Sequence, residues 1–142
     1  MADTGLAPKL YGYAEVEGAP TAYVMEYLDP CAWETLHQFL KSDAAAMDRT
    51  QLQEALDGII GKLELKNYVH GDLRSNNIMI RTNVKEKSMG LRVIDFDWAG
   101  KAGQVCYPAE RNREIQWPGK AGGPIEQNHN FKMVDSWMKD LQ

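Results

Sequence analysis

The sequence predicts an α+β domain that is mainly α-helical, and three observations lead to this prediction. Apolar residues recur at the helical period around residues 50–63 and 125–141. Short runs of aromatic and β-branched residues, which are typical of strands, lie before and between these two stretches. A Gly- and Pro-rich run at residues 98–124 indicates a long irregular segment.

The composition limits the class of protein. Its 142 residues, of which 44% are hydrophobic, suffice for one domain with a core. A net charge of −4 argues against nucleic-acid and membrane partners. No apolar run approaches the ~20 residues of a membrane span, and the first residues do not resemble a signal peptide. Cys31 and Cys106 are isolated and form no metal or disulfide pattern, so we expect an intracellular, cytoplasmic protein.

The N-terminal part is expected to contain a short tail followed by paired strands. Residues 1–9 show no pattern and are interpreted as the tail. Residues 10–14 and 22–28 are rich in aromatic and β-branched residues, and the turn formers Gly18 and Pro20 lie between them. This arrangement predicts a hairpin or two paired strands.

A first helix is predicted to start at Asp29 and Pro30. Aspartate is a favoured N-cap, and proline is favoured at the first helical position. Trp33, Leu36 and Leu40 then follow at helical spacing.

A second helix is predicted after Thr50 and Gln53, which fit a capping box. We expect Gly58 and Gly61 to mark close packing, because glycine otherwise weakens a helix. The apolar stripe of this helix is expected in the core and consists of Leu52, Leu56, Ile59, Ile60 and Leu63.

A last helix is predicted within residues 125–141. One side of it is expected to carry the apolar residues Phe131, Val134, Trp137, Met138 and Leu141.

Two strands and a polar loop between the second and last helices hold the candidate site. Strands are predicted at residues 77–81 and 91–95, joined into a hairpin by a solvated linker. Asp72 precedes the first strand, Asn77 begins it, and Asp95 ends the second. Each of these residues alone is more often a turn or strand cap. Together, at one end of two strands, they predict a site for a hard cation such as Mg²⁺, which prefers oxygen ligands.

The motifs in this region resemble those of kinases. Residues 70–77 read H-G-D-L-R-S-N-N, which resembles the kinase catalytic loop H-R-D-L-x-x-x-N, and Asp95-Phe96-Asp97 stands at the place of D-F-G. Glycine at the second position is familiar from aminoglycoside and choline kinases. Over nearly its whole length the chain is similar to the protein-kinase-like superfamily, and most to the fungal-type protein-kinase-like domain.

This resemblance implies a definite architecture. Residues 10–142 would form a partial protein-kinase-like domain, namely a C-terminal lobe with hinge strands and a small catalytic β-hairpin. Its catalytic loop would be residues 68–80 and its activation-like segment residues 95–124. The sequence contains no G-x-G-x-x-G loop and no V-A-I-K strand. The resemblance therefore predicts a domain truncated before the hinge, with the N-terminal lobe largely absent.

The resemblance also implies roles for the loop residues. Asp72 would accept a hydrogen bond and later the proton of the attacking hydroxyl, and Arg74 would contact the transferred phosphate. Asn77 and Asp95 would be ligands of Mg²⁺. His70 would support the loop structurally.

Further implied positions lie outside the loop. Met25 would be the gatekeeper, and the Glu26 carbonyl and Leu28 amide would meet the adenine edge of ATP; the plain alternative is a buried edge strand. Asp97 replaces the glycine of D-F-G, and we expect it to face water. The pair His129-Asn130 stands where fungal relatives tend to carry His-Asp, so we expect weaker buried support for the loop.

The expected function is that of a phosphotransferase that uses ATP and Mg²⁺. The expected acceptor is a protein Ser/Thr hydroxyl. Two alternatives stay open: a catalytically inactive, pseudokinase-like binding module, and a small-molecule kinase of the aminoglycoside or choline type. A hydrolase is disfavoured, because the chain has no G-x-S-x-G motif.

Overall fold

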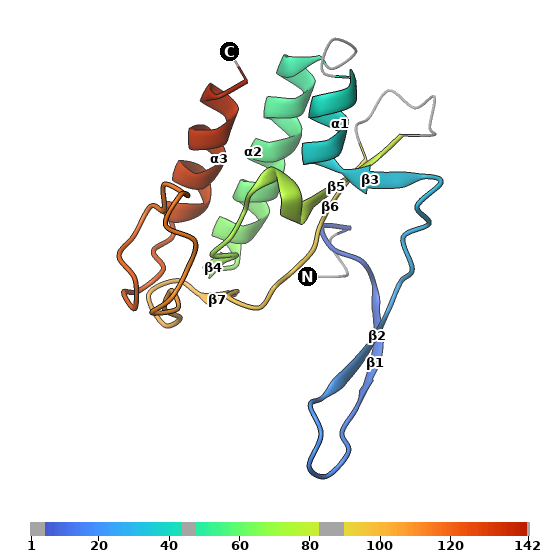
Figure 1. Ribbon diagram of the computed structural model, residues 1–142, viewed down its shortest axis with the longest axis vertical. Coiled ribbons are helices and arrows are strands. Elements are labelled where there is room, and N and C mark those ends of the chain that lie inside the picture. The colour runs from blue at the N-terminus through green and yellow to red at the C-terminus, as the bar shows by residue number, and fades with distance from the viewer. Residues whose placement is uncertain (1–4, 44–47, 83–89, 142) are drawn as a thin grey trace.

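The computed structural model describes residues 5–43, 48–82 and 90–141. This part of the chain is a small mixed α/β domain in which helices pack beside small antiparallel sheets (Figure 1), so the α+β class is confirmed. In chain order the elements are β1 Leu10–Ala14, β2 Ala22–Met25, β3 Trp33–Thr35, α1 Leu36–Asp43, α2 Arg49–Leu65, β4 Tyr68–Val69, the short 3-10 helix η3 Ser75–Asn77, β5 Ile78–Arg81, β6 Leu91–Val93, β7 Gly100–Lys101 and α3 His129–Lys139.

Helix α2 supplies the centre of the core, as its apolar stripe predicts. All residues of the stripe are buried, namely Leu52, Leu56, Ile59, Ile60 and Leu63. The cap differs from the prediction, because the Asp48 carboxylate accepts hydrogen bonds from the backbone amides of Thr50 (2.9 Å) and Gln51 (3.2 Å). The predicted capping box is therefore wrong, since Thr50 already lies inside the helix that begins at Arg49.

Gly58 and Gly61 of α2 do not mark close packing, contrary to the prediction. No described atom lies within 4 Å of the position that a Cβ would take at either glycine. Both residues lie off the buried stripe, so they weaken the helix without a gain in packing.

Helix α1 starts later than predicted, at Leu36 and not at Pro30. Asp29 makes a turn instead of a cap, because its carboxylate accepts a hydrogen bond from the amide two residues later at 2.9 Å. The Thr35 hydroxyl accepts a hydrogen bond from the Gln38 amide in the first turn of α1 (3.2 Å). The prediction failed because β3 is held by pairing with the distant strand β5.

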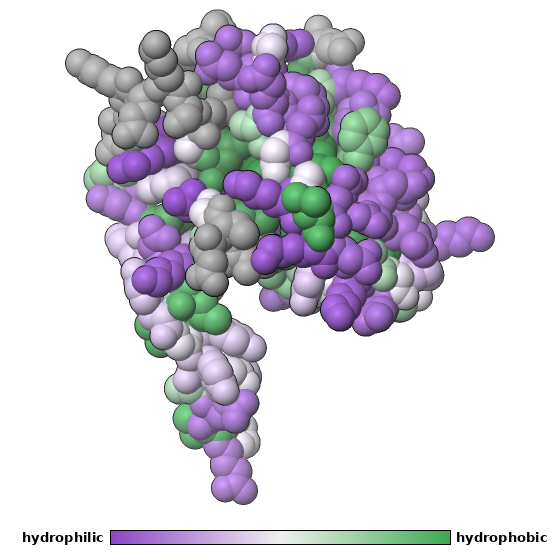
Figure 2. Space-filling model, turned by 180° about the vertical axis from the view of Figure 1, so that it is seen from behind, coloured by the Kyte–Doolittle hydropathy of each residue, from purple (hydrophilic) through white to green (hydrophobic). Residues whose placement is uncertain are grey.

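Strands β1 and β2 pair antiparallel, as predicted, and form an arm that extends from the rest of the molecule (Figure 1). Seen from behind, this β1–β2 arm is a protrusion with pale and apolar patches beside a mostly hydrophilic body (Figure 2). Large exposed apolar side chains of the arm include Tyr11, Tyr13, Val16, Tyr23 and Val24. The alternative of a buried edge strand is wrong, since all residues of β2 are exposed.

The described end of the predicted N-terminal tail is packed against β6. Leu6 and Ala7 are buried. The Leu6 carbonyl accepts a hydrogen bond from the Val93 amide at 2.8 Å, and the Gly5 carbonyl accepts one from the Arg92 side chain at 2.6 Å. These contacts tie the start of the described chain to the core.

Strands β5 and β6 form the predicted hairpin, and β3 adds a third strand on the other side of β5. Ile78 pairs with Val93, and Ile80 pairs with Leu91. These side chains are buried in one core with the leucines of α2. Residues 83–89 of the predicted linker lie outside the described residues.

Segment 95–124 is irregular, as predicted. It contains the short strand β7, which pairs with β4, and an isolated bridge between Cys106 and Pro124. Helix α3 follows and lies beside α2 (Figure 1). Across the described residues, none of the helices combines the length and the apolar character that crossing a bilayer requires.

Helix α3 agrees with the predicted apolar side only in part. It begins at His129. Val134 is buried, as expected, together with Met133. The prediction is wrong for Phe131, because this residue is 50% exposed.

Candidate active site

The polar loop between β4 and β5 begins with a turn that only glycine fits. Gly71 has a φ of +86°, a conformation that side chains disfavour. A Cβ there would lie 2.9 Å from both the Trp98 Cβ and the Ile125 Cδ1. The glycine of the H-G-D motif is thus required by the turn and by its close neighbours.

His70 is completely buried and joins two strands of the site. The Asp72 amide donates to its Nδ1 at 3.2 Å, and its Nε2 lies 3.0 Å from the Ile94 carbonyl. A neutral ring in this setting carries its proton on Nε2. Burial lowers the pKa of His70 and outweighs the opposing effects of the Ile94 carbonyl and the charges of Asp72 and Asp95. The neutral ring therefore holds the loop at Asp72 against the chain at Ile94, which agrees with the supporting role expected for it.

Helix α3 holds the loop in place through Asn130, which is 2% exposed. Its Oδ1 accepts a hydrogen bond from the His70 amide (3.0 Å), and its Nδ2 donates to the Tyr68 carbonyl (3.4 Å). Trp137 on the same helix donates its indole N–H to the Leu73 carbonyl at 3.1 Å. The expectation that asparagine weakens this support stays a prediction; in the structure the amide both accepts and donates, whereas a carboxylate would only accept.

Asp72 and Arg74 form a bidentate ion pair. Arg74 Nε lies 2.5 Å from Asp72 Oδ1, and Nη2 lies 2.6 Å from Oδ2. The Asp72 hydrogen bond is the main cause of a raised Arg74 pKa, and the charges of Asp72 and Asp95 add to it. The candidate base and the candidate phosphate ligand are therefore in direct contact.

Asn77 crosses the loop and closes it. Its Nδ2 donates to the Asp72 carbonyl at 2.9 Å, and its own carbonyl accepts from the Ile94 amide at 2.9 Å. The side chain is buried, with the residue 8% exposed. Because the amide nitrogen is committed to Asp72, the amide oxygen is the atom left for a ligand.

Asp95 follows Ile94, the residue that both His70 and Asn77 contact. It is exposed and has a φ of +63°, which is uncommon outside glycine but more frequent for aspartate. Its charge acts on His70 and on Arg74. Asp95 therefore lies near the other loop residues at the ends of β5 and β6.

The loop offers two carboxylates and one amide to a metal. Among the described residues, no group of three or more His, Cys, Asp or Glu side chains is placed to hold an ion. Magnesium in phosphate sites needs only one or two carboxylates, since substrate oxygens and water complete its shell. Asp95 and Asn77 fit that donor set, with Asp72 engaged by Arg74. Asp97 is exposed, as expected.

The residues expected at the hinge lie on or beside the β1–β2 arm. Met25 ends β2 and is 57% exposed. Glu26 closes the base of the arm, because its amide donates to the Lys9 carbonyl at 2.7 Å and its carboxylate accepts from the Lys9 amide at 3.0 Å. Leu28 is half-buried. The structure does not assemble Met25, Glu26 and Leu28 into an enclosed pocket, and their contact with adenine stays a prediction.

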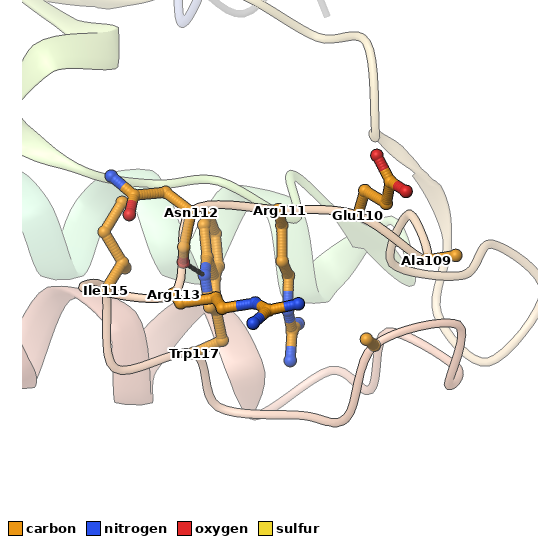
Figure 3. A pocket seen from close by; sticks show the side chains of 8 residues that line it. Ala109, Glu110, Arg111, Asn112, Arg113, Ile115 and Trp117 are labelled. Atoms are coloured by element: carbon orange, nitrogen blue, oxygen red, sulfur yellow. Dashed lines mark hydrogen bonds between the residues drawn. The ribbon is translucent and has the colours of Figure 1, made fainter.

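A cavity in the irregular segment was missed by the sequence analysis. It has a volume of about 690 Å³, and its lining includes Glu110, Arg111, Arg113 and Trp117 (Figure 3). Two arginines separated by one residue, close to a tryptophan, were the available signal. That signal is weak, because nothing in the sequence fixes how an irregular segment folds.

Trp117 connects this cavity to the loop. The guanidinium carbons of Arg74 and Arg111 each lie 5.3 Å from the centre of the Trp117 ring system. Burial raises the pKa of Tyr107 to about 12, while the charge of Arg111 lowers it and that of Asp72 raises it. The cavity and the Asp72–Arg74 pair are therefore neighbours.

Comparison of the chain with models of protein families and with curated proteins finds no match. The functional assignment therefore rests on the motifs and on the geometry of the loop.

Proposed function

We propose that the chain is the C-terminal-lobe portion of a protein-kinase-like phosphotransferase that binds ATP and Mg²⁺ and transfers phosphate to a hydroxyl group. The observation that carries this proposal is the linked set of Asp72, Arg74, Asn77 and Asp95 at the ends of β5 and β6. Within the loop, a hydrogen bond joins Asn77 to Asp72, and a bidentate ion pair joins Arg74 to Asp72. Phosphoryl transfer depends mainly on such positioning of charge.

Asp72 is the proposed catalytic residue. One of its carboxylate oxygens would accept a hydrogen bond from the attacking hydroxyl, orient it, and take its proton late in the reaction. Its backbone is fixed on both sides, by the His70 ring at its amide and by Asn77 at its carbonyl. Such anchoring limits the motion of the carboxylate and favours an oriented base.

Arg74 would exchange its partner during binding. In the structure it neutralises both oxygens of Asp72. A bound phosphate offers the same planar fork of oxygens, so the guanidinium can turn to it and leave Asp72 available for the hydroxyl.

Asn77 and Asp95 would hold Mg²⁺ through the amide oxygen and the carboxylate. When bound, the ion neutralises charge on the phosphate oxygens. Met25, Glu26 and Leu28 remain the proposed contacts of the nucleotide base. Because both cysteines are free, we also propose a reducing compartment, the cytoplasm, as the place of action.

The direct test is transfer of the γ-phosphate of ATP, measured for the chain and for Asp72→Asn. Loss of the base should lower the rate about a hundredfold or more. Asp97→Asn is the matched control, because Asp97 is exposed and the substitution replaces a carboxylate with an amide in the same way. Equal rates for the chain and Asp72→Asn would overturn the proposal.

A binding module without turnover is the second candidate function. One observation favours it, because Arg74 occupies both oxygens of Asp72 and leaves neither free for an attacking hydroxyl. Thermal unfolding with ATP, in the presence and absence of Mg²⁺, separates the candidates. A Mg²⁺-dependent rise in the unfolding temperature without phosphate transfer would support the binding module.

A further inference from the structure

Arg111 is a half-buried cation that forms no ion pair with the residues that the structure describes. Its guanidinium lies 4.7 Å from the centre of the Tyr107 ring and 5.3 Å from that of Trp117, so aromatic faces hold it in place. Its Nη2 donates to the Gly119 carbonyl at 2.5 Å. Its Nη1 is buried and has no hydrogen-bond partner in the described part of the chain. An unpaired buried cationic donor costs free energy, and a small movement of the side chain that brought Nη1 to an anionic oxygen would remove that cost.

The neighbouring charges do not supply such an oxygen. Neither Arg111 nor Arg113 forms an ion pair with a carboxylate among the described residues. Both arginines line the cavity, and in Figure 3 the carboxylate of Glu110 points away from their guanidinium groups. Like charges placed together repel each other, and a bound anion would relieve this repulsion.

The cavity has the dimensions of a small-molecule site. Its volume of about 690 Å³ falls within the range of small-molecule sites, and it is an open pocket, since most of the residues that line it are exposed. It lies beside the Asp72–Arg74 pair, because Trp117 contacts both Arg74 and Arg111. A molecule anchored by the arginines can therefore extend toward the proposed catalytic residue.

We propose that this cavity binds a small molecule that carries a carboxylate or phosphate group, and that this molecule is the acceptor of the transferred phosphate. The second half of this proposal rests on the proposed function. Arg111 and Arg113 would hold the anionic group, and a hydroxyl elsewhere on the molecule would face Asp72. The choice departs from the protein hydroxyl that the resemblance implies.

The transfer step balances without a further reactant. The acceptor oxygen forms a bond to the γ-phosphorus of ATP. The bond from that phosphorus to the bridging oxygen breaks, and its electron pair leaves with ADP. The hydroxyl proton passes to Asp72.

The test is calorimetric titration of the chain without nucleotide. The anionic probes are gluconate, which carries a carboxylate, and glycerol 3-phosphate, which carries a phosphate. Glucose and glycerol are their neutral counterparts. We expect at least one anion to bind about tenfold or more tightly than its neutral counterpart, because a charge-assisted hydrogen bond contributes at least that factor. The probe that binds more tightly than its neutral counterpart identifies the anionic group.

Two variants show where the anion binds. Arg113→Gln should weaken binding about tenfold or more, since it removes one charged ligand. Arg113 is exposed, so its replacement leaves the packing of the segment intact. Lys120→Gln is the control. It removes one positive charge from the same segment, and Lys120 does not line the cavity.

Each outcome decides one statement. Equal binding of the anionic and neutral probes, or equal effects of Arg113→Gln and Lys120→Gln, would overturn the anion site. Anion binding with no phosphate transfer to the bound probe in the presence of ATP and Mg²⁺ would leave the site standing and overturn its role as the acceptor site. The transfer assay with Asp72→Asn is independent of these titrations, so failure of the proposed function is recognised separately.

Discussion

Asn130 on α3 accepts a hydrogen bond from the His70 backbone amide at 3.0 Å and so fixes the first residue of the H-G-D motif from a helix far along the chain. The same side chain donates to the Tyr68 carbonyl at 3.4 Å. Two loop positions are thereby set by one buried amide, which makes its removal a sensitive test of the architecture.

Asn130→Ala should lower the free energy of unfolding by about 1–3 kcal/mol, because buried backbone groups lose their partners. The measurement is urea denaturation followed by circular dichroism. Asn128→Ala is the control, since Asn128 is exposed and its side chain makes no capping hydrogen bond. A loss for Asn130→Ala no larger than that of the control would contradict the support described here.

Stability should fall as the pH falls below the ordinary histidine pKa. Burial lowers the pKa of His70 from 6.5, so the unfolded chain takes up a proton more readily than the folded one. The stabilising effect is therefore complete above pH 6.5 and is lost as the pH falls toward the folded pKa, by at most about 1.4 kcal/mol per pH unit for one histidine. His129 acts in the same direction.

Denaturant titrations between pH 7.5 and about pH 5 measure this dependence. His70→Gln should flatten the curve, because it removes the buried group whose pKa is lowered. A curve for His70→Gln that is parallel to that of the unchanged chain would show that His70 is not the group responsible.

Gly71→Ala should be strongly destabilising, because it combines a φ of +86° with two contacts at 2.9 Å. Gly122→Ala isolates the first effect, since Gly122 has a φ of +69° and no described atom near the position of a Cβ. The backbone term alone is about 1–2 kcal/mol, and the clash at Gly71 should add about 1–3 kcal/mol. Thermal unfolding of both variants checks the difference, and equal losses would exclude the clash.

Alanine at Gly58 and Gly61 should stabilise the protein. Both glycines lie inside α2 with no described atom within 4 Å of the added methyl group. Each replacement should raise the free energy of unfolding by about 0.5–1 kcal/mol, because alanine favours helix and restricts the unfolded chain. A higher denaturation midpoint for each single variant, and a larger shift for the double variant, is the expected result. Destabilisation by either would reveal packing that the structure does not show.

Local patterns carried most of the correct predictions. The buried stripe of α2 was predicted because apolar residues recur there at the helical period. The β5–β6 hairpin was predicted because its strands are short runs rich in β-branched residues. The motif residues Asp72 and Asn77 were recognised for a similar reason, since a short loop holds both.

The failures involve contacts between distant segments. Strand β3 was missed because its pairing with β5 is invisible in the local sequence, which instead contains an N-cap pattern at Asp29. The contacts of Asn130 could not be predicted either, because they depend on the backbone groups that it meets in the folded chain. The cavity around Arg111 was missed because irregular segments have no period to read.

The anchor of the loop has a consequence for the order in which the molecule is completed. Residues 70–77 leave the ribosome well before Asn130 and Trp137, which hold them in place. The nascent chain therefore lacks these ties to the loop until α3 has been synthesised and docked.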